Sequence, residues 1–185
     1  MIKLQNSTIK VNKFFNELFG RETTRFDLLL ILFGLIILTV ATQKMCFGSD
    51  LSVSKKIILA FLTLDIGGGV IANFTEGTNN YYSENAKRRY LFIVIHILQP
   101  LILSWIFENN IFMILSLTVY VLISSFIITS IKQKNTQKTI AATMLLTAII
   151  LIFSLPFSQL VLQLILLIYS LKLILSFSVN WTNQS

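Results

Sequence analysis

The stretch KIILAFLTLDIGGGVIANF, residues 56–74, shows both what kind of protein this is and where its chemistry should lie. It is apolar and long enough to cross a bilayer core of about 30 Å as a helix. It also places Asp65 near the membrane centre, where a charged aspartate costs at least about 2.5–3.5 kcal/mol. Gly67, Gly68 and Gly69 follow directly, and each costs about 1 kcal/mol relative to alanine in a helix interior. Because a purely structural helix would avoid both costs, we expect a functional site here.

The composition of the whole chain is typical of a protein that lies in lipid. Of its 185 residues, 55% are apolar and 12% are charged, and the mean hydropathy is +0.77, whereas a soluble domain carries about 25% charged residues. We predict an all-α polytopic integral membrane protein whose six transmembrane helices cover Phe26–Cys46, Lys56–Phe74, Tyr90–Phe107, Ile111–Ile131, Ile140–Leu155 and Leu160–Phe177.

The predicted spans divide the chain into three parts. Residues 1–25 form an N-terminal segment, residues 26–177 the transmembrane domain and residues 178–185 a cytoplasmic tail. The stretch STIKVNKFFNELFG, residues 7–20, predicts a short amphipathic helix on an anionic membrane surface, and an extended lead-in is the alternative. The polar stretch TEGTNNYYSENAKRR, residues 75–89, is predicted to be the loop between the second and third spans.

The basic residues predict the orientation in the membrane. The N-terminal segment and the loops after the second and fourth spans carry eleven lysines and arginines, whereas the opposite side carries three. The positive-inside rule then places both termini in the cytoplasm of a multi-pass protein of the cell membrane. The net charge of +7 is explained by contact with anionic lipid headgroups, and no nucleic-acid-binding motif is present in the sequence.

The sequence argues against several kinds of chemistry. Cys46 is the one cysteine and His96 the one histidine, which excludes an intramolecular disulfide, a thiolate cluster and a multi-histidine zinc site. Asp65, Asn73 and His96 would be a poor zinc set because amides bind zinc weakly. We therefore expect no metal and no cofactor.

Helical spacing gathers polar and small residues on one face of the second span. Asp65, Gly69 and Asn73 follow one another at intervals of four residues and share this face. The glycines have two interpretations: close helix packing, or a cavity beside Asp65 at a hinge. The residues expected to contact a substrate, from this face, the following loop and the later spans, are Asn73, Asn79, Asn80, Tyr81, Tyr82, Gln99 and Lys172.

The third and sixth spans supply possible partners for Asp65. A side-by-side hairpin brings His96 close to Asp65, and such a pair could transfer protons. Gln99 lies one helical turn after His96, and Pro100 removes a backbone hydrogen bond and can bend the helix. Lys172 has two interpretations. In the preferred interpretation its side chain snorkels to the headgroups, and in the other it forms an ion pair with Asp65.

Three classes of function fit this pattern. The first is a transporter, or the substrate-binding subunit of one, with a polar site open to the cytoplasm and a possible partner subunit or second copy. The second is a membrane-embedded enzyme that acts on a lipid or amphipathic metabolite through Asp65 and His96. The third is a non-catalytic membrane helper or immunity protein. Access to Asp65 distinguishes them, because only a helper buries it against another helix.

Overall fold

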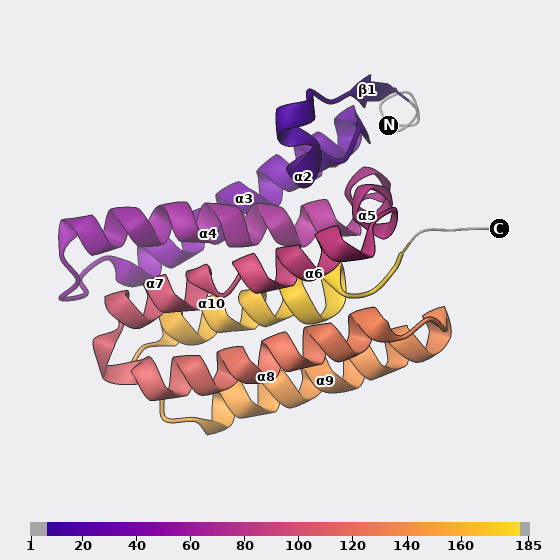
Figure 1. The fold of residues 1–185 in the computed structure, drawn as a ribbon. Helices are drawn as coiled ribbons and strands as arrows, with labels where there is room; N and C mark the ends of the chain where they lie inside the picture. The colour runs from indigo at the N-terminus through magenta and orange to yellow at the C-terminus, as the bar shows by residue number, and fades with distance from the viewer. Residues whose placement is uncertain (1–6, 182–185) are drawn as a thin grey trace.

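The computed structural model describes residues 7–181, and six helical spans dominate it (Figure 1). Residues 1–6 of the predicted N-terminal segment and residues 182–185 of the predicted tail lie outside the described residues. The elements of the spans are α3 (Arg25–Cys46), α4 (Val53–Phe74), α6 (Ala86–Ile95), α7 (Leu98–Ile106), η2 (Glu108–Asn110), α8 (Ile111–Ser130), α9 (Lys134–Ser154), α10 (Leu160–Ser170) and η3 (Leu171–Phe177). Six spans in this part of the chain are long and apolar enough to cross a membrane, which confirms the predicted number.

The spans run alternately between two ends of the bundle (Figure 1). One end, here called the α5 end, carries α5 (Glu76–Ser83) and the α8–α9 turn. The other end, the η2 end, carries the α3–α4 and α9–α10 connections. The prediction of a loop over residues 75–89 is wrong, because α5 and the start of α6 fill most of it. The fifth span begins six residues earlier than predicted, since its polar first turns, from Lys134, are already helical.

The N-terminal segment forms a compact hairpin, so the predicted helix over residues 7–20 is wrong for its first part, which is a strand, and only residues 13–19 are helical. Its strands β1 (Thr8–Lys10) and β2 (Glu22–Thr24) pair antiparallel, and the turns η1 (Lys13–Phe15) and α2 (Asn16–Phe19) connect them. The hairpin docks on α5 by a close backbone contact at Gly20 and Gly77, where a Cβ on either residue would overlap the backbone of the opposite segment. Contacts with distant residues have therefore overridden the local helical pattern.

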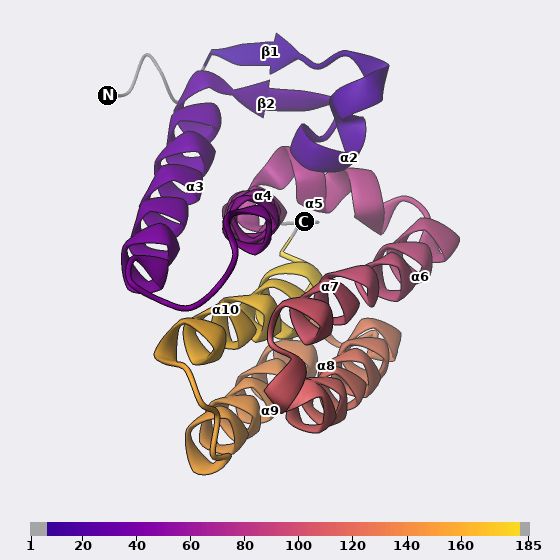
Figure 2. The ribbon, with the colours of Figure 1, turned by 90° about the vertical axis from the view of Figure 1, so that its left-hand side faces the viewer.

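The spans pack as three groups around α10 and η3 (Figure 2). Helices α3 and α4 form a pair on one side, α8 and α9 form a pair on the opposite side, and α6 with α7 lies beside them. The core between these groups is apolar, and its largest fully buried side chains include Leu59, Leu103, Ile165 and Tyr169. Helix α4 packs along α3 and against η3, which leaves its remaining side facing α6 and α7.

Two of the spans are irregular at the same level as the polar face of α4. The third span is interrupted at His96 and Ile97, between α6 and α7. The sixth span widens into the π-helical segment η3, in which the Ser178 amide donates to the Leu173 carbonyl oxygen, five residues back, at 3.2 Å. Such π turns concentrate at functional sites, and here the turn carries Lys172.

Candidate functional site

The three glycines of α4 face two different neighbours. A Cβ on Gly67 would lie 2.9 Å from the Leu38 side chain of α3, and a Cβ on Gly68 would make ordinary contacts of 3.5–3.9 Å with the same helix. A Cβ on Gly69 would instead overlap Lys172 of η3, with its Nζ at 2.7 Å. The close-packing interpretation therefore holds for Gly67 and Gly68. At Gly69 the space is filled by a charged side chain, and α4 continues without a break from Val53 to Phe74, so the glycines form no hinge.

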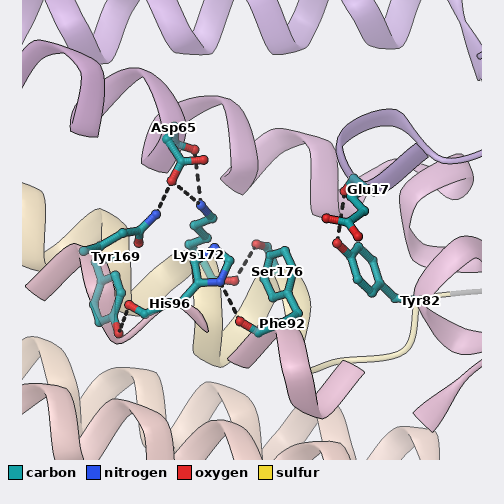
Figure 3. Close-up of polar contacts among 9 residues, drawn as sticks. Glu17, Asp65, Tyr82, Phe92, His96, Tyr169, Lys172 and Ser176 are labelled. Carbon is teal, nitrogen blue, oxygen red and sulfur yellow. Dashed lines mark hydrogen bonds and ion pairs between the residues drawn. The ribbon is translucent and has the colours of Figure 1, made fainter. Parts of the chain in front are cut away.

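Lys172 uses this room to reach Asp65. Its Nζ lies 3.2 Å from Asp65 Oδ2 and 3.3 Å from the Asp65 carbonyl oxygen (Figure 3). The preferred interpretation of Lys172 as a snorkelling residue is thus wrong, and the ion pair is present. The pair is asymmetric: the Lys172 side chain is 2% exposed and that of Asp65 is 51% exposed. The lysine is the buried partner, and the carboxylate faces outward from α4.

Two buried amides lie on the same side of α4 as the carboxylate, and one of them contacts it. Gln99 of α7 donates through Nε2 to Asp65 Oδ2, and its Oε1 is buried without a partner among the described residues. Asn73 lies two turns after Asp65 on the same side of α4, and within the described part of the chain its buried Nδ2 also has no partner. Since buried polar groups are normally paired, these two amides have hydrogen-bonding capacity that residues 7–181 do not use.

His96 lies at the break in the third span, and Pro100 explains the break. Proline lacks the N–H that would bind the His96 carbonyl oxygen in a regular helix, and the Tyr169 hydroxyl donates to that oxygen instead, at 3.3 Å (Figure 3). The His96 ring nitrogen Nδ1 lies 2.6 Å from the Phe92 carbonyl oxygen. Because a carbonyl oxygen only accepts, Nδ1 carries the proton, and the neutral ring keeps a lone pair on Nε2.

Two cavities meet at Asp65 and His96. The first, of about 330 Å³, extends toward the α5 end and is also lined by Gly69, Asn73 and Lys172. The second, of about 390 Å³, extends toward the η2 end, and Gln99 belongs to its lining. We call the two together the groove; it runs between α4 and the α6–α7 span. Asp65 and His96 thus share both cavities, while the hydrogen bonds described for the carboxylate go to Gln99 and Lys172.

The N-terminal hairpin covers the α5 end of the groove. Phe14, Phe15 and Leu18 line the first cavity and are themselves exposed apolar side chains. The Tyr82 hydroxyl donates to the Glu17 carbonyl oxygen at 3.2 Å, which ties α5 to the hairpin. Burial raises the pKa of the Tyr82 phenol, with Glu17 adding to the effect, so the hydroxyl keeps its proton as a donor.

The remaining predicted contact residues lie elsewhere. Asn79 holds the chain after η3: its Nδ2 donates to the Val179 carbonyl oxygen at 3.3 Å, and its Oδ1 accepts from the Trp181 amide at 3.0 Å. Asn80 and Tyr81 line a separate polar cavity between the hairpin and α5. The structure therefore brings together Asp65, Asn73, Tyr82, His96, Gln99 and Lys172, and leaves the other three outside the groove.

Sequence reasoning missed two contributors to the site. The first is Tyr169: a proline leaves the carbonyl oxygen four residues earlier without its usual donor, so the need for a donor was predictable, but the residue that supplies it was not. The phenylalanines of the hairpin reach the groove only because the hairpin docks on α5. Among residues 7–181, no three histidine, cysteine, aspartate or glutamate side chains gather closely enough to hold a metal ion.

Comparisons with protein-family models, with curated proteins and with solved structures find no match to this chain.

Proposed function

We propose that the protein is a membrane carrier, or the substrate-binding subunit of one, for small amphipathic molecules. The observation that supports this function best is the groove, whose two cavities run from Asp65 and His96 toward opposite ends of the bundle. A carrier needs a central polar site that can be reached from each side in turn. A ligand with an apolar body and a polar head matches apolar walls that surround a few polar groups.

Helix irregularities at the level of Asp65 support the same proposal. The break at His96, the π turn at Lys172 and Gly69 all lie beside the carboxylate, and interrupted helices at membrane depth are tolerated where they line a cavity. The helper function is less well supported, because the Asp65 side chain is half-exposed in the groove rather than buried against a neighbouring helix.

A membrane-embedded enzyme is the second candidate, and His96 is the observation that favours it. Its Nδ1 proton is held by the Phe92 carbonyl oxygen, so Nε2 has the lone pair of a general base. A base beside a carboxylate in an amphiphile-sized groove would suit proton abstraction from a lipid or an amphipathic metabolite. This candidate predicts a chemically changed product, whereas a carrier returns its substrate unchanged.

We also propose that the α5 end faces the cytoplasm of a cell-membrane protein. The basic residues of the hairpin, of the start of α6 and of the α8–α9 turn all belong to this end, and they would contact anionic headgroups. In a Cys46→Ala background, a membrane-impermeant maleimide added to intact cells should label Asn109→Cys at the η2 end and should not label Gln133→Cys at the α5 end. The reverse pattern would invert the orientation.

Proteoliposomes test the transport proposal. Purified protein would be reconstituted and assayed for counterflow of amphipathic molecules with cationic, zwitterionic and anionic heads, followed by mass spectrometry. We expect at least one unchanged molecule to cross, and Asp65→Asn to reduce its rate at equal protein content. Asp50→Asn, in the α3–α4 connection, makes the same chemical change outside the groove and should transport normally. Conversion of a molecule without net movement would support the enzyme. If neither transport nor conversion is observed, the helper function is the one that remains.

A further inference from the structure

The charged groups of the groove decide which kind of amphipathic molecule it suits, so this inference rests on the proposed function. The titratable groups that face Asp65 or line the groove with it come from four elements and one helix break: Glu17 of α2, Tyr82 of α5, Arg88 of α6, Lys172 of η3 and His96 at the α6–α7 break. Tyr169 of α10 adds a hydroxyl that is bound to the His96 carbonyl oxygen.

The negative charge of the central pair is the accessible one. The Asp65 side chain is half-exposed, whereas Lys172 is almost fully covered and lies against Gly69. Arg88, the other cation of the cavity wall, is engaged with Tyr81: it donates to the carbonyl oxygen at 2.6 Å and its guanidinium lies 3.9 Å from the ring centre. A molecule that enters the groove at the level of Asp65 therefore meets a carboxylate.

The walls of the groove suit an organic cation with an apolar body. Aromatic side chains line the first cavity, Phe14, Phe15, Tyr82 and Phe92, and Phe61 lines the second. Aromatic faces attract cations as well as apolar surface, and quaternary cations without N–H donors depend on such contacts. A carboxylate with aromatic walls thus favours lipophilic cations over lipophilic anions.

We propose that the groove binds a lipophilic organic cation at Asp65 in exchange for the proton of Lys172. One carboxylate can neutralise one cation at this depth, and a buried ammonium without a counter-ion is strongly disfavoured. When the ligand takes over Asp65, a Lys172 Nζ–H bond breaks, the electron pair stays on nitrogen and the proton leaves to water through the groove. One positive charge enters and one leaves, so the net charge of the site is unchanged.

A pair of probes with matched shape and opposite charge tests this exchange. Tetraphenylphosphonium and tetraphenylborate would be titrated into the protein in phosphatidylcholine nanodiscs, with empty nanodiscs as the blank. Calorimetry in two buffers of different ionisation enthalpy counts the protons released. We expect the phosphonium ion to bind, with release of one proton per cation, and the borate ion not to bind specifically.

Two variants test whether Lys172 releases the proton and whether binding requires the charges of the Asp65–Lys172 pair. Lys172→Arg keeps a cation that does not lose its proton, so phosphonium binding should weaken at least about tenfold and the proton release should vanish. Asp65→Asn/Lys172→Met removes both charges, leaves no buried ion unpaired and should abolish binding in a folded protein. Asp50→Asn is the control and should match the wild type in affinity and in proton count.

Each of the other outcomes overturns a specific part of the proposal. Phosphonium binding without proton release, or proton release that persists in Lys172→Arg, would overturn the exchange. Specific borate binding in place of phosphonium binding would overturn the cationic ligand while the proposed carrier of amphipathic molecules stands. Binding of neither probe to a folded protein, together with no counterflow of any amphipathic molecule, would remove both proposals.

Discussion

Helix α4 meets α3 on one face and borders the groove on another, and its three glycines divide between these faces. Gly67 and Gly68 bring the α3 and α4 backbones close, and Gly34 on α3 contributes from the other side, against the Ile71 side chain. At Gly69 the nearest atoms belong to the Lys172 side chain of η3, which uses the space to reach Asp65.

The comparison shows that the role of a small residue in a membrane helix depends on what that face of the helix packs against. On the α3 face, missing side chains improve van der Waals contact between helices, the main source of helix association in lipid. On the groove face, a missing side chain permits a buried ion pair, and that pair fixes a charge at membrane depth. Neighbouring residues of one sequence motif thus serve stability on one side and chemistry on the other.

The largest expected effect comes from breaking the ion pair on its exposed side. Asp65→Asn removes the counter-ion of the buried Lys172, which must then stay charged and unpaired or give up its proton, and this should lower the free energy of unfolding by about 3–5 kcal/mol. Lys172→Met should cost less, because the half-exposed Asp65 can be solvated or take up a proton, and the double variant should recover much of the loss. Unfolding in mixed micelles with increasing dodecyl sulfate measures all three. Equal losses in both single variants would contradict the asymmetry.

Alanine substitutions compare the two faces directly. Gly69→Ala places a methyl group against Lys172 and should cost about 1–3 kcal/mol of unfolding free energy, as overpacking does. Gly68→Ala meets only ordinary contacts of 3.5–3.9 Å, so it should be neutral or stabilise the helix by up to about 1 kcal/mol. The same micelle titration separates them, and a Gly68→Ala loss as large as that of Gly69→Ala would break the comparison.

A smaller loss of unfolding free energy is expected from a substitution at the helix break opposite α4. Tyr169→Phe removes the donor to the His96 carbonyl oxygen and should cost about 1 kcal/mol. In a Pro100→Ala background, the restored amide can bind the same oxygen, so the additional loss from Tyr169→Phe should shrink toward zero. A double-mutant cycle measures this coupling, and additive losses would show that the hydroxyl does not replace the missing amide.

The smallest effect is expected for the ion pair at the η2 end of α4. Lys55 Nζ lies 2.6 Å from Glu108 Oε1, but the Glu108 side chain is largely exposed. Exposed pairs contribute about 0.2–1 kcal/mol, so Glu108→Gln should change the free energy of unfolding by no more than that. A loss comparable to that of Asp65→Asn would mean that depth and burial do not set the difference between the two pairs.

Local pattern determined much of the fold. The six spans follow from length and hydropathy, because a helix that satisfies its own backbone hydrogen bonds is the only open-ended structure that lipid tolerates. The shared face of Asp65, Gly69 and Asn73 follows from the helical repeat, and all three line the first cavity. The break near Pro100 follows from the missing amide. Each of these depends on residues within a few positions of one another.

Partners distant in the sequence were decided by tertiary structure alone. Asp65 and Lys172 are 107 residues apart, and only the packing of η3 against α4 selects the ion pair over a snorkelling lysine. The packing of α3 and of η3 against two faces of α4 likewise places Gly67 and Gly68 against α3 and Gly69 against Lys172. The N-terminal hairpin forms where a helix was predicted, because strand pairing and docking on α5 outweigh a weak local preference. A side chain's neighbours depend on how the spans meet, and the hydropathy of each span does not encode that.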